Sequence, residues 1–252
     1  MRKLYALTAV LALLCLAPAV WGEDAEESGM QLQQINMQAR LFFEKGLRLE
    51  RELKFQDAVQ AYEDAVRLQP DYADAQLHLG LVYVRLEQYP PAVNAFRETV
   101  RLQPSWVAAR ENLGAALIKI KRWEEARDQF QEVVRLRPDS AEGHYSLGLA
   151  YGRLKRDQEA MQAFLKATQL QPDMVKAHDN LGLAYMNLAR WQDAANSFKK
   201  AISLKQDDAQ AHFGLCAYYM QMGNKEALDK EYQVLQKLDP KMAQKLKEMM
   251  QK

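Results

Sequence analysis

The sequence has very few cysteines and no excess of charge of either sign. Cys15 and Cys216 are its only cysteines in 252 residues, which is too few for a disulfide framework. Lys and Arg number 34 against 33 Asp and Glu, so the chain lacks the positive field on which non-specific nucleic-acid binding depends. We therefore predict a fold held together by side-chain packing and no nucleic-acid partner.

Motifs that bring catalytic groups together are missing as well. The chain has no glycine-rich phosphate loop, no G-x-S-x-G turn, no H-E-x-x-H helix and no cysteine pair at metal-ligand spacing. We expect no enzymatic activity, and with it no catalytic residue, no cofactor and no metal site.

A long uncharged apolar run is present only at the N-terminus. Arg2 and Lys3 precede this run, small residues such as Ala19 and Gly22 follow it, and an acidic stretch comes next. This order is typical of an export signal, so residues 1–22 are predicted to be a signal peptide cleaved after Ala19 or Gly22. The expected location is periplasmic or secreted. The alternative is anchoring in a membrane through residues 1–22, because the run approaches the roughly 17–25 residues that span a bilayer.

A step of 34 residues organises most of the remaining chain. Prolines follow it at Pro70, Pro104, Pro138 and Pro172. Glycines follow it at Gly46, Gly80, Gly114, Gly148 and Gly182. Alanines follow it at Ala58, Ala92, Ala126, Ala160 and Ala194. Aromatic residues follow it at Tyr62, Phe96, Phe130, Phe164, Phe198 and Tyr232. Four residue types that recur with the same 34-residue spacing indicate tandem repeats. Such repeats determine the overall architecture, so they are identified before the individual helices.

Each unit has the spacing of two amphipathic helices. In residues 141–172, apolar side chains recur at i, i+4 and i+7 on both sides of a polar break at 155–157. The proline ends the second helix because it cannot continue the hydrogen-bond ladder. The Asp or Ser directly after each proline position is expected to cap the next helix. These residues are Asp71, Ser105, Asp139, Asp173 and Asp207.

The glycine and aromatic columns predict close packing. A glycine inside a helix costs roughly 1 kcal/mol relative to alanine, so its recurrence suggests that a neighbouring backbone passes too close for a side chain. We expect small residues to meet small residues there. The aromatic column is expected to fill the gap between neighbouring units.

The unit formed by Leu147, Gly148, Tyr151, Ala160, Phe164 and Pro172 resembles the tetratricopeptide repeat. The pattern returns at Leu181, Gly182, Tyr185, Ala194 and Phe198. The resemblance implies an all-α fold, a right-handed α-solenoid of tandem helix-turn-helix repeats. It covers six repeats, at residues 39–72, 73–106, 107–140, 141–174, 175–208 and 209–242. Residues 23–38 would then form an N-terminal leader that runs into the first helix, and residues 243–252 a C-terminal capping helix.

The outer repeats depart from this pattern. Lys45 stands where leucine is usual and Leu49 where tyrosine is usual, while Cys216 takes the glycine position of the last repeat. Departures from the repeat pattern in the first and last repeats are expected for a solenoid, because the outer faces of these repeats are exposed to solvent. Cys216 is expected to be buried as a small apolar residue.

Three histidines, His144, His178 and His212, occupy the same position in three successive repeats. Equivalent positions on stacked helix pairs are about 8–10 Å apart. Zinc ligands must each lie roughly 2.0–2.1 Å from one ion. We therefore favour amphipathic rings packed between units over a shared metal site.

In the tetratricopeptide repeat family, the first helix of each repeat lines a concave groove. The resemblance implies that the equivalent residues here form a partner-binding groove. Its apolar floor would consist of Phe43, Leu47, Leu77, Leu81, Val84, Ile118, Tyr145, Leu149, Leu183, Met186, Phe213 and Met220. One bordering position carries Arg51, Arg85, Lys119 and Arg153, followed by Asn187.

Two interpretations of the basic column are open. If it faces the groove, it favours an extended or helical peptide with apolar anchors and some acidic groups. Otherwise its members are solvated helix residues paired with neighbours such as Glu50. Family members that grip a carboxylate use lysine at another groove position, which here holds Phe43, Leu77, Glu111, Tyr145, Asp179 and Phe213. That carboxylate clamp is missing.

The sequence thus predicts a non-catalytic scaffold or assembly factor of the cell envelope that binds a partner peptide or helix. Two alternatives use other chemistry: a small-ligand or glycan receptor with the same groove, and a membrane-tethered component of an envelope complex. The oligomeric state and the identity of the partner are left open.

Overall fold

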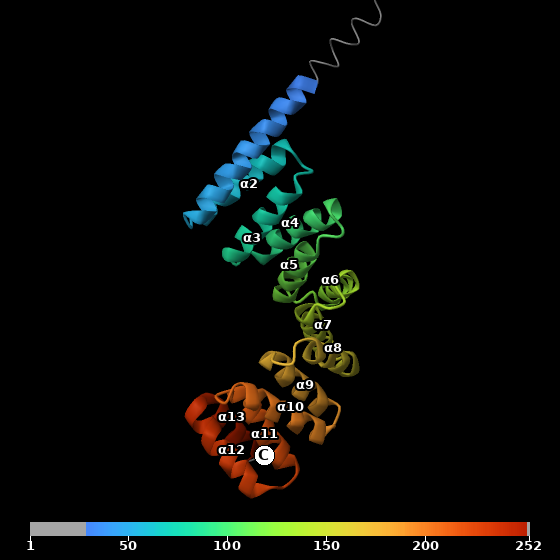
Figure 1. Ribbon diagram of the computed structural model, residues 1–252. Helices are drawn as coiled ribbons and strands as arrows, with labels where there is room; N and C mark the ends of the chain where they lie inside the picture. The colour runs from blue at the N-terminus through green and yellow to red at the C-terminus, as the bar shows by residue number, and fades with distance from the viewer. Residues whose placement is uncertain (1–28, 251–252) are drawn as a thin grey trace, which may run out of the picture. The chain divides into compact units, whose positions relative to one another are not determined.

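The computed structural model describes residues 29–250, and within that range every regular element is a helix (Figure 1). Residues 29–51 are helical. The helices that follow are α2 (Phe55–Leu68), α3 (Ala73–Arg85), α4 (Tyr89–Leu102), α5 (Val107–Lys119), α6 (Trp123–Leu136), α7 (Ala141–Arg153), α8 (Asp157–Leu170), α9 (Val175–Asn187), α10 (Trp191–Leu204), α11 (Ala209–Gln221), α12 (Lys225–Leu238) and α13 (Pro240–Met250). The predicted signal peptide lies outside the described residues.

The helices alternate in length along the tandem repeats. From α3 to α12, the first helix of each pair has 13 residues and the second has 14. The second helices end at Leu68, Leu102, Leu136 and Leu170, two residues before the recurring prolines. The predicted fold class is confirmed: the chain is an all-α protein of the α-solenoid class, built from tandem helical hairpins.

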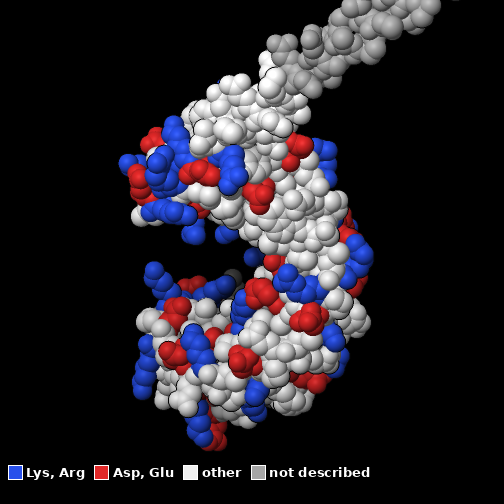
Figure 2. Space-filling view, turned by 45° about the horizontal axis from the view of Figure 1, so that its top comes forward, with Lys and Arg blue, Asp and Glu red and all other residues white. Residues whose placement is uncertain are grey.

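The described residues divide into two compact units, with the boundary between Pro104 and Ser105. In the first unit, the segment 29–51, α2, α3 and α4 share a core around Tyr62, which is fully buried. In the second unit, each helix from α5 to α12 packs against the next. On the face shown in Figure 2, acidic and basic side chains are interspersed, as the nearly equal charge totals suggest.

The glycine column has a different partner from the one expected. A Cβ built on Gly46, Gly80, Gly114, Gly148 or Gly182 would lie no more than 2.9 Å from ring atoms of the aromatic residue 16 positions later in the same repeat. The prediction that small residues meet small residues is therefore wrong, because a large flat ring occupies the space. Phe198 also lies against Gly214 of the next repeat, so at that position the aromatic column fills the space between units.

The helix caps also differ from the prediction. The N-cap residues of α3, α5, α7, α9 and α11 are Tyr72, Trp106, Ser140, Met174 and Asp208, one residue after the expected caps. Of these, only Ser140 and Asp208 accept a backbone hydrogen bond through the side chain. The Asp or Ser after each proline position instead lies in the turn that precedes the cap.

The turns inside the repeats share a left-handed residue that the sequence pattern did not reveal. Leu53, Glu87, Lys121, Lys155, Ala189 and Gly223 have φ between +56° and +68°. They are spaced by the same 34 residues, yet only the last is glycine. Non-glycine residues adopt this conformation at a cost of roughly 1–2 kcal/mol, so hairpin packing must compensate for it.

The terminal faces explain the atypical outer repeats. Lys45 is exposed, whereas the equivalent residues of later repeats are buried: Leu79, Leu113, Leu147, Leu181 and Leu215. Within the described residues, no helix precedes the first repeat to cover this face. Residues 29–38, predicted as a leader, are helical and continuous with the first repeat. They leave Met30 and Met37 exposed by 63% and 67%.

At the other end, α13 covers the last repeat. It begins at Pro240, three residues before the predicted capping helix, and buries Ala243 and Leu246 against Leu228 and Leu235. Across residues 29–250, each helix is too short or too polar to span a bilayer.

Candidate functional site

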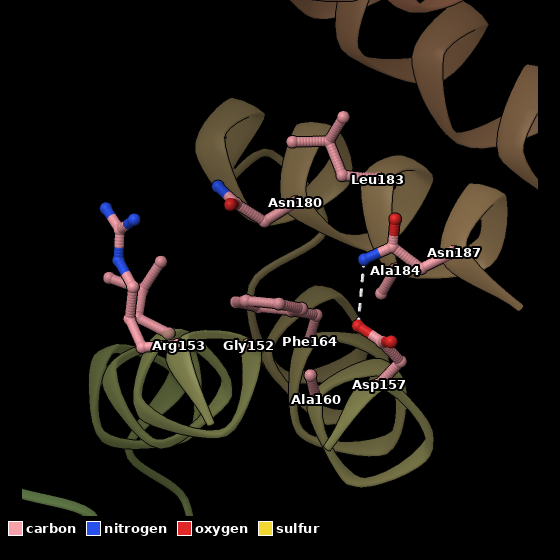
Figure 3. Close-up of a pocket in the computed structure, with 10 residues that line it drawn as sticks. Gly152, Arg153, Asp157, Ala160, Phe164, Asn180, Leu183, Ala184 and Asn187 are labelled. Atoms are coloured by element: carbon pink, nitrogen blue, oxygen red, sulfur yellow. Dashed lines mark hydrogen bonds between the residues drawn. The ribbon is translucent and has the colours of Figure 1, made fainter. Parts of the chain in front are cut away.

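A pocket of about 260 Å³ opens in the second unit between α7, α8 and α9 (Figure 3). Its lining consists of Leu149, Gly152, Arg153, Asp157, Ala160, Phe164, Asn180, Leu183, Ala184 and Asn187. Four of these were predicted as groove residues: Leu149, Arg153, Leu183 and Asn187. The structure therefore brings side chains from the first helices of the fourth and fifth repeats to one cavity.

The base of the pocket is apolar. The Phe164 ring and Ala160 of α8 are 3% and 1% exposed, and Ala184 of α9 is 4% exposed. Leu183, at 37% exposed, adds an apolar side chain that solvent reaches. Gly152 keeps the α7 side wide, because a Cβ built on it would have no atom within 4 Å.

Polar groups around this base have defined orientations. The Asn187 amide Nδ2 donates a hydrogen bond to Asp157 Oδ1 at 2.8 Å, which fixes the amide and leaves its oxygen as an acceptor. The Asn180 amide Nδ2 donates to the Lys176 carbonyl oxygen at 2.8 Å, so its oxygen is an acceptor too. The pocket thus combines an apolar base with two side-chain carbonyl groups.

Arg153 supplies the positive charge of the pocket. Its guanidinium lies over the Trp123 ring, 5.8 Å from the ring centroid. An aromatic face holds a cation in place without neutralising its charge. Arg153 is exposed, and among residues 29–250 the structure gives it no carboxylate partner. A ligand with an acidic group could therefore pair with it.

The other predicted groove residues of the second unit are distributed differently. Tyr145 packs against Phe164 with ring centroids 5.8 Å apart and receives the Lys176 ammonium over its face. Phe213 and Met220 pack against the C-terminal core. Ile118 and Met186 are half-buried, and Lys119 is exposed.

In the first unit, the predicted apolar residues mostly contribute to packing. Phe43 and Leu47 pack against the core of that unit, and Leu77 is buried. Leu81 and Val84 are half-buried, while Arg51 and Arg85 are exposed. Glu50, suggested as an ion-pair partner of the basic column, instead accepts hydrogen bonds from Tyr62 and His78.

Sequence reasoning missed several members of the pocket, chiefly Gly152, Asp157 and Asn180. Asn180 had a weak signal, because asparagine also stands 68 residues earlier, at Asn112. Asp157 belongs to the polar break between the two helices, where an acidic residue is ordinary. Only the packing of α8 against α9 places it beside Asn187.

The three aligned histidines connect the repeats. In His144, His178 and His212, Nε2 donates to the carbonyl oxygen six residues earlier, at 3.0, 2.9 and 3.0 Å. His178 and His212 are buried, so the prediction of rings packed between units is confirmed for these two. Within the described part of the chain, no group of three His, Cys, Asp or Glu side chains could hold a metal ion.

Cys216 is fully buried, as predicted for a residue in the glycine column. Burial raises the pKa of its thiol to about 12, and the nearby charge of Glu231 acts in the same direction. The thiolate, which is the reactive form of cysteine, is therefore strongly disfavoured.

Several solved structures have the same fold. MamA from Desulfovibrio magneticus is 27% identical, with a TM-score of 0.63, covering 68% of this chain and 97% of that one. YrrB, a tetratricopeptide repeat protein with an unusual peptide-binding site, is 17% identical with a TM-score of 0.64, covering 75% and 99%. PilW, a type IV pilus biogenesis factor, is 20% identical with a TM-score of 0.67, covering 82% and 97%. No curated protein matches the chain at a significant level.

Two family models locate the repeats in the chain itself. One tetratricopeptide repeat model matches residues 43–105, 79–141 and 112–175, and another matches residues 175–208. Together they span residues 43–208, which is more than half of the chain. The protein therefore belongs to the tetratricopeptide repeat family.

Proposed function

We propose that this protein is a non-catalytic scaffold or assembly factor of the cell envelope that binds a peptide or helix of a partner protein. The observation that carries the proposal is the pocket between α7, α8 and α9, where predicted groove residues of two repeats meet. The proposed location rests on the export signal read in residues 1–22.

The size of the pocket favours a single side chain of a larger partner. Sites for small molecules usually measure roughly 300–1,000 Å³, whereas this pocket measures about 260 Å³. An apolar anchor would lie on Phe164, while Asn180 and Asn187 offer acceptors to main-chain N–H groups beside it. An acidic group next to the anchor would pair with Arg153. A glycan or small-ligand receptor is the less favoured alternative.

The related structures support a role in protein interaction at the level of the fold. YrrB has a peptide-binding site, and PilW is a type IV pilus biogenesis factor. Since one scaffold serves unrelated partners, the partner must be sought experimentally.

Site-specific crosslinking in the producing cell tests the proposal. A photoreactive residue at Leu183, which lines the pocket, should capture a protein partner. The same residue at Gln162, exposed on α8 and outside the pocket lining, is the matched control. Gly152→Leu should abolish capture at Leu183, because its side chain fills open pocket space without a clash at Cβ. Equal capture at both positions, or capture that Gly152→Leu leaves unchanged, would contradict the proposal.

A further inference from the structure

Asp179 of α9 is a buried carboxylate with an unsatisfied oxygen. Its side chain lies in the second unit, and the residue is 4% exposed. Among residues 29–250, its Oδ1 is the one buried side-chain nitrogen or oxygen that has no hydrogen-bond partner. Buried polar groups are nearly always paired, so this exception calls for a physical explanation.

A second buried carboxylate acts on Asp179 from the N-cap of the next repeat's first helix. Asp208, the N-cap of α11, is 8% exposed. Its Oδ1 accepts hydrogen bonds from the backbone N–H groups of Gln210 and Ala211 at 3.0 and 3.2 Å. Both bonds end on the same carboxylate oxygen, which is the arrangement of a helix N-cap. α9 and α11 are in contact, so the carboxylates belong to the joint between the fifth and sixth repeats.

Few groups compensate for this negative charge. The Lys205 ammonium lies 3.6 Å from Asp208 Oδ2, but its side chain is 53% exposed. On the α7 side, the Tyr145 hydroxyl is uncharged: burial raises its pKa, and the charges of Glu142 and Asp179 add to the rise. His178, the neighbour of Asp179 on α9, donates its Nε2 hydrogen to the Pro172 carbonyl. Within the described residues, the charges that act on Asp179 are those of Asp208 and Lys205.

Burial therefore opposes ionisation of Asp179. Desolvation raises its pKa to about 7, the charge of Asp208 adds to the rise, and Lys205 partly offsets it. The physical reason is that a lone charge in a low-dielectric interior is costly, and the group avoids that cost by keeping its proton.

We propose that Asp179 is a proton-operated switch at the joint between α9 and α11. While the carboxyl carries its proton, the joint stays packed. When the proton is lost, two buried negative charges lie at one joint, the exposed Lys205 offsets them only in part, and the sixth repeat with α13 loosens from α9. The device needs no ligand and stands apart from the proposed peptide binding.

The sign of the effect follows from linkage. Between the ordinary aspartate pKa of 3.8 and the raised value of about 7, the packed state holds a proton that an open, solvated state releases. The packed state is therefore favoured at low pH, loses stability as the pH rises through this window, and loses no more above it. From pH 6 to pH 8, the equilibrium constant for opening should rise roughly tenfold.

Hydrogen exchange of the full-length protein at pH 6 and pH 8 tests the switch, once intrinsic exchange rates are corrected for pH. In the wild type, the amides of α11–α13 should show the roughly tenfold increase in opening. In Asp179→Asn, which cannot ionise, opening should not depend on pH in this range. Asp207→Asn, at an exposed acid beside Asp208, should behave like the wild type. The same pH dependence in wild type and Asp179→Asn would overturn the proposal.

Two further measurements test the switch even if Asp179→Asn is too unstable to study. The carboxyl carbon of Asp179 in the wild type should titrate near pH 7 by NMR, and a midpoint near pH 4 would overturn the proposal. Asp208→Asn removes the neighbouring charge and keeps a capping side chain. It should lower the midpoint for Asp179, and an unchanged midpoint would show that the two carboxylates do not act together.

Discussion

The Phe164 ring lies directly on the backbone of Gly148, so that a Cβ on Gly148 would come within 2.6–2.9 Å of three ring atoms. The same relationship joins glycine and aromatic ring in each of the first five repeats. Glycine is needed there because the aromatic side chain of the second helix fills the space over the first.

Gly148→Ala should destabilise the protein by about 1–3 kcal/mol, because a buried ring would have to move to admit the new methyl group. Gly152→Ala is the matched control on the same helix. Its Cβ meets nothing within 4 Å, and alanine favours the helix by up to about 1 kcal/mol. Urea denaturation followed by circular dichroism measures both changes. Equal effects of the two substitutions would show that the ring is not the cause.

Lys155→Gly should stabilise the protein by about 1 kcal/mol, because Lys155 has φ of +56° in the turn between α7 and α8. Gly223→Ala makes the reverse change at the equivalent turn, where φ is +68°, and should destabilise by a similar amount. Opposite shifts of the urea midpoint are expected. Shifts of the same sign would show that the left-handed backbone conformation does not cause the changes in stability.

His212→Phe should cost about 1–3 kcal/mol, because it removes two hydrogen bonds of a buried ring and leaves the half-buried Glu231 carboxylate without this partner. In the wild type, Nδ1 of His212 lies 2.6 Å from Glu231 Oε2 while Nε2 donates to the Gln206 carbonyl. His144→Phe, at the same position two repeats earlier, loses one bond to an exposed carbonyl that water can replace. Thermal unfolding should therefore show a smaller loss for His144→Phe, and the reverse order would disprove this account.

Cys216 should resist alkylation in the folded protein. Its thiol is fully buried and its pKa is raised to about 12, so at pH 8 the thiolate is scarce and inaccessible. Iodoacetamide should modify it quickly in urea and hardly at all under native conditions, as peptide mass spectrometry can show. Rapid native labelling would mean that the last repeat opens readily.

Arg153→Glu should weaken binding of an acidic partner peptide by tenfold or more while leaving stability within about 0.5 kcal/mol, because Arg153 is exposed. Lys166→Glu, an equal charge change at an exposed residue of α8 outside the pocket lining, is the control. Isothermal titration calorimetry with the peptide identified by crosslinking measures the affinity of both variants. If both variants weaken binding equally, only the net charge matters.

The 34-residue step, the helix pairs and the helix ends before each proline could all be read from the sequence. These features are local, because periodicity, proline and helix propensity act within a single hairpin. The caps were misplaced by one residue, since the turn geometry decides which backbone groups need a partner. The left-handed turn residues were invisible, because five of the six are not glycine.

The candidate site likewise has some residues that could be identified from the sequence and others that only the tertiary structure brings together. Leu149, Arg153, Leu183 and Asn187 could be identified from their recurring positions, because the first helix presents the same face in every repeat. Their meeting with Asp157 and Phe164 depends on how α8 packs between α7 and α9. Asp179 shows the difference most clearly: in sequence it is one more groove position, and only burial beside the cap of α11 makes its charge costly. The sequence determined the repeat and its helices because they depend on neighbours along the chain, whereas tertiary structure decided which side chains are enclosed, since enclosure depends on neighbours in space.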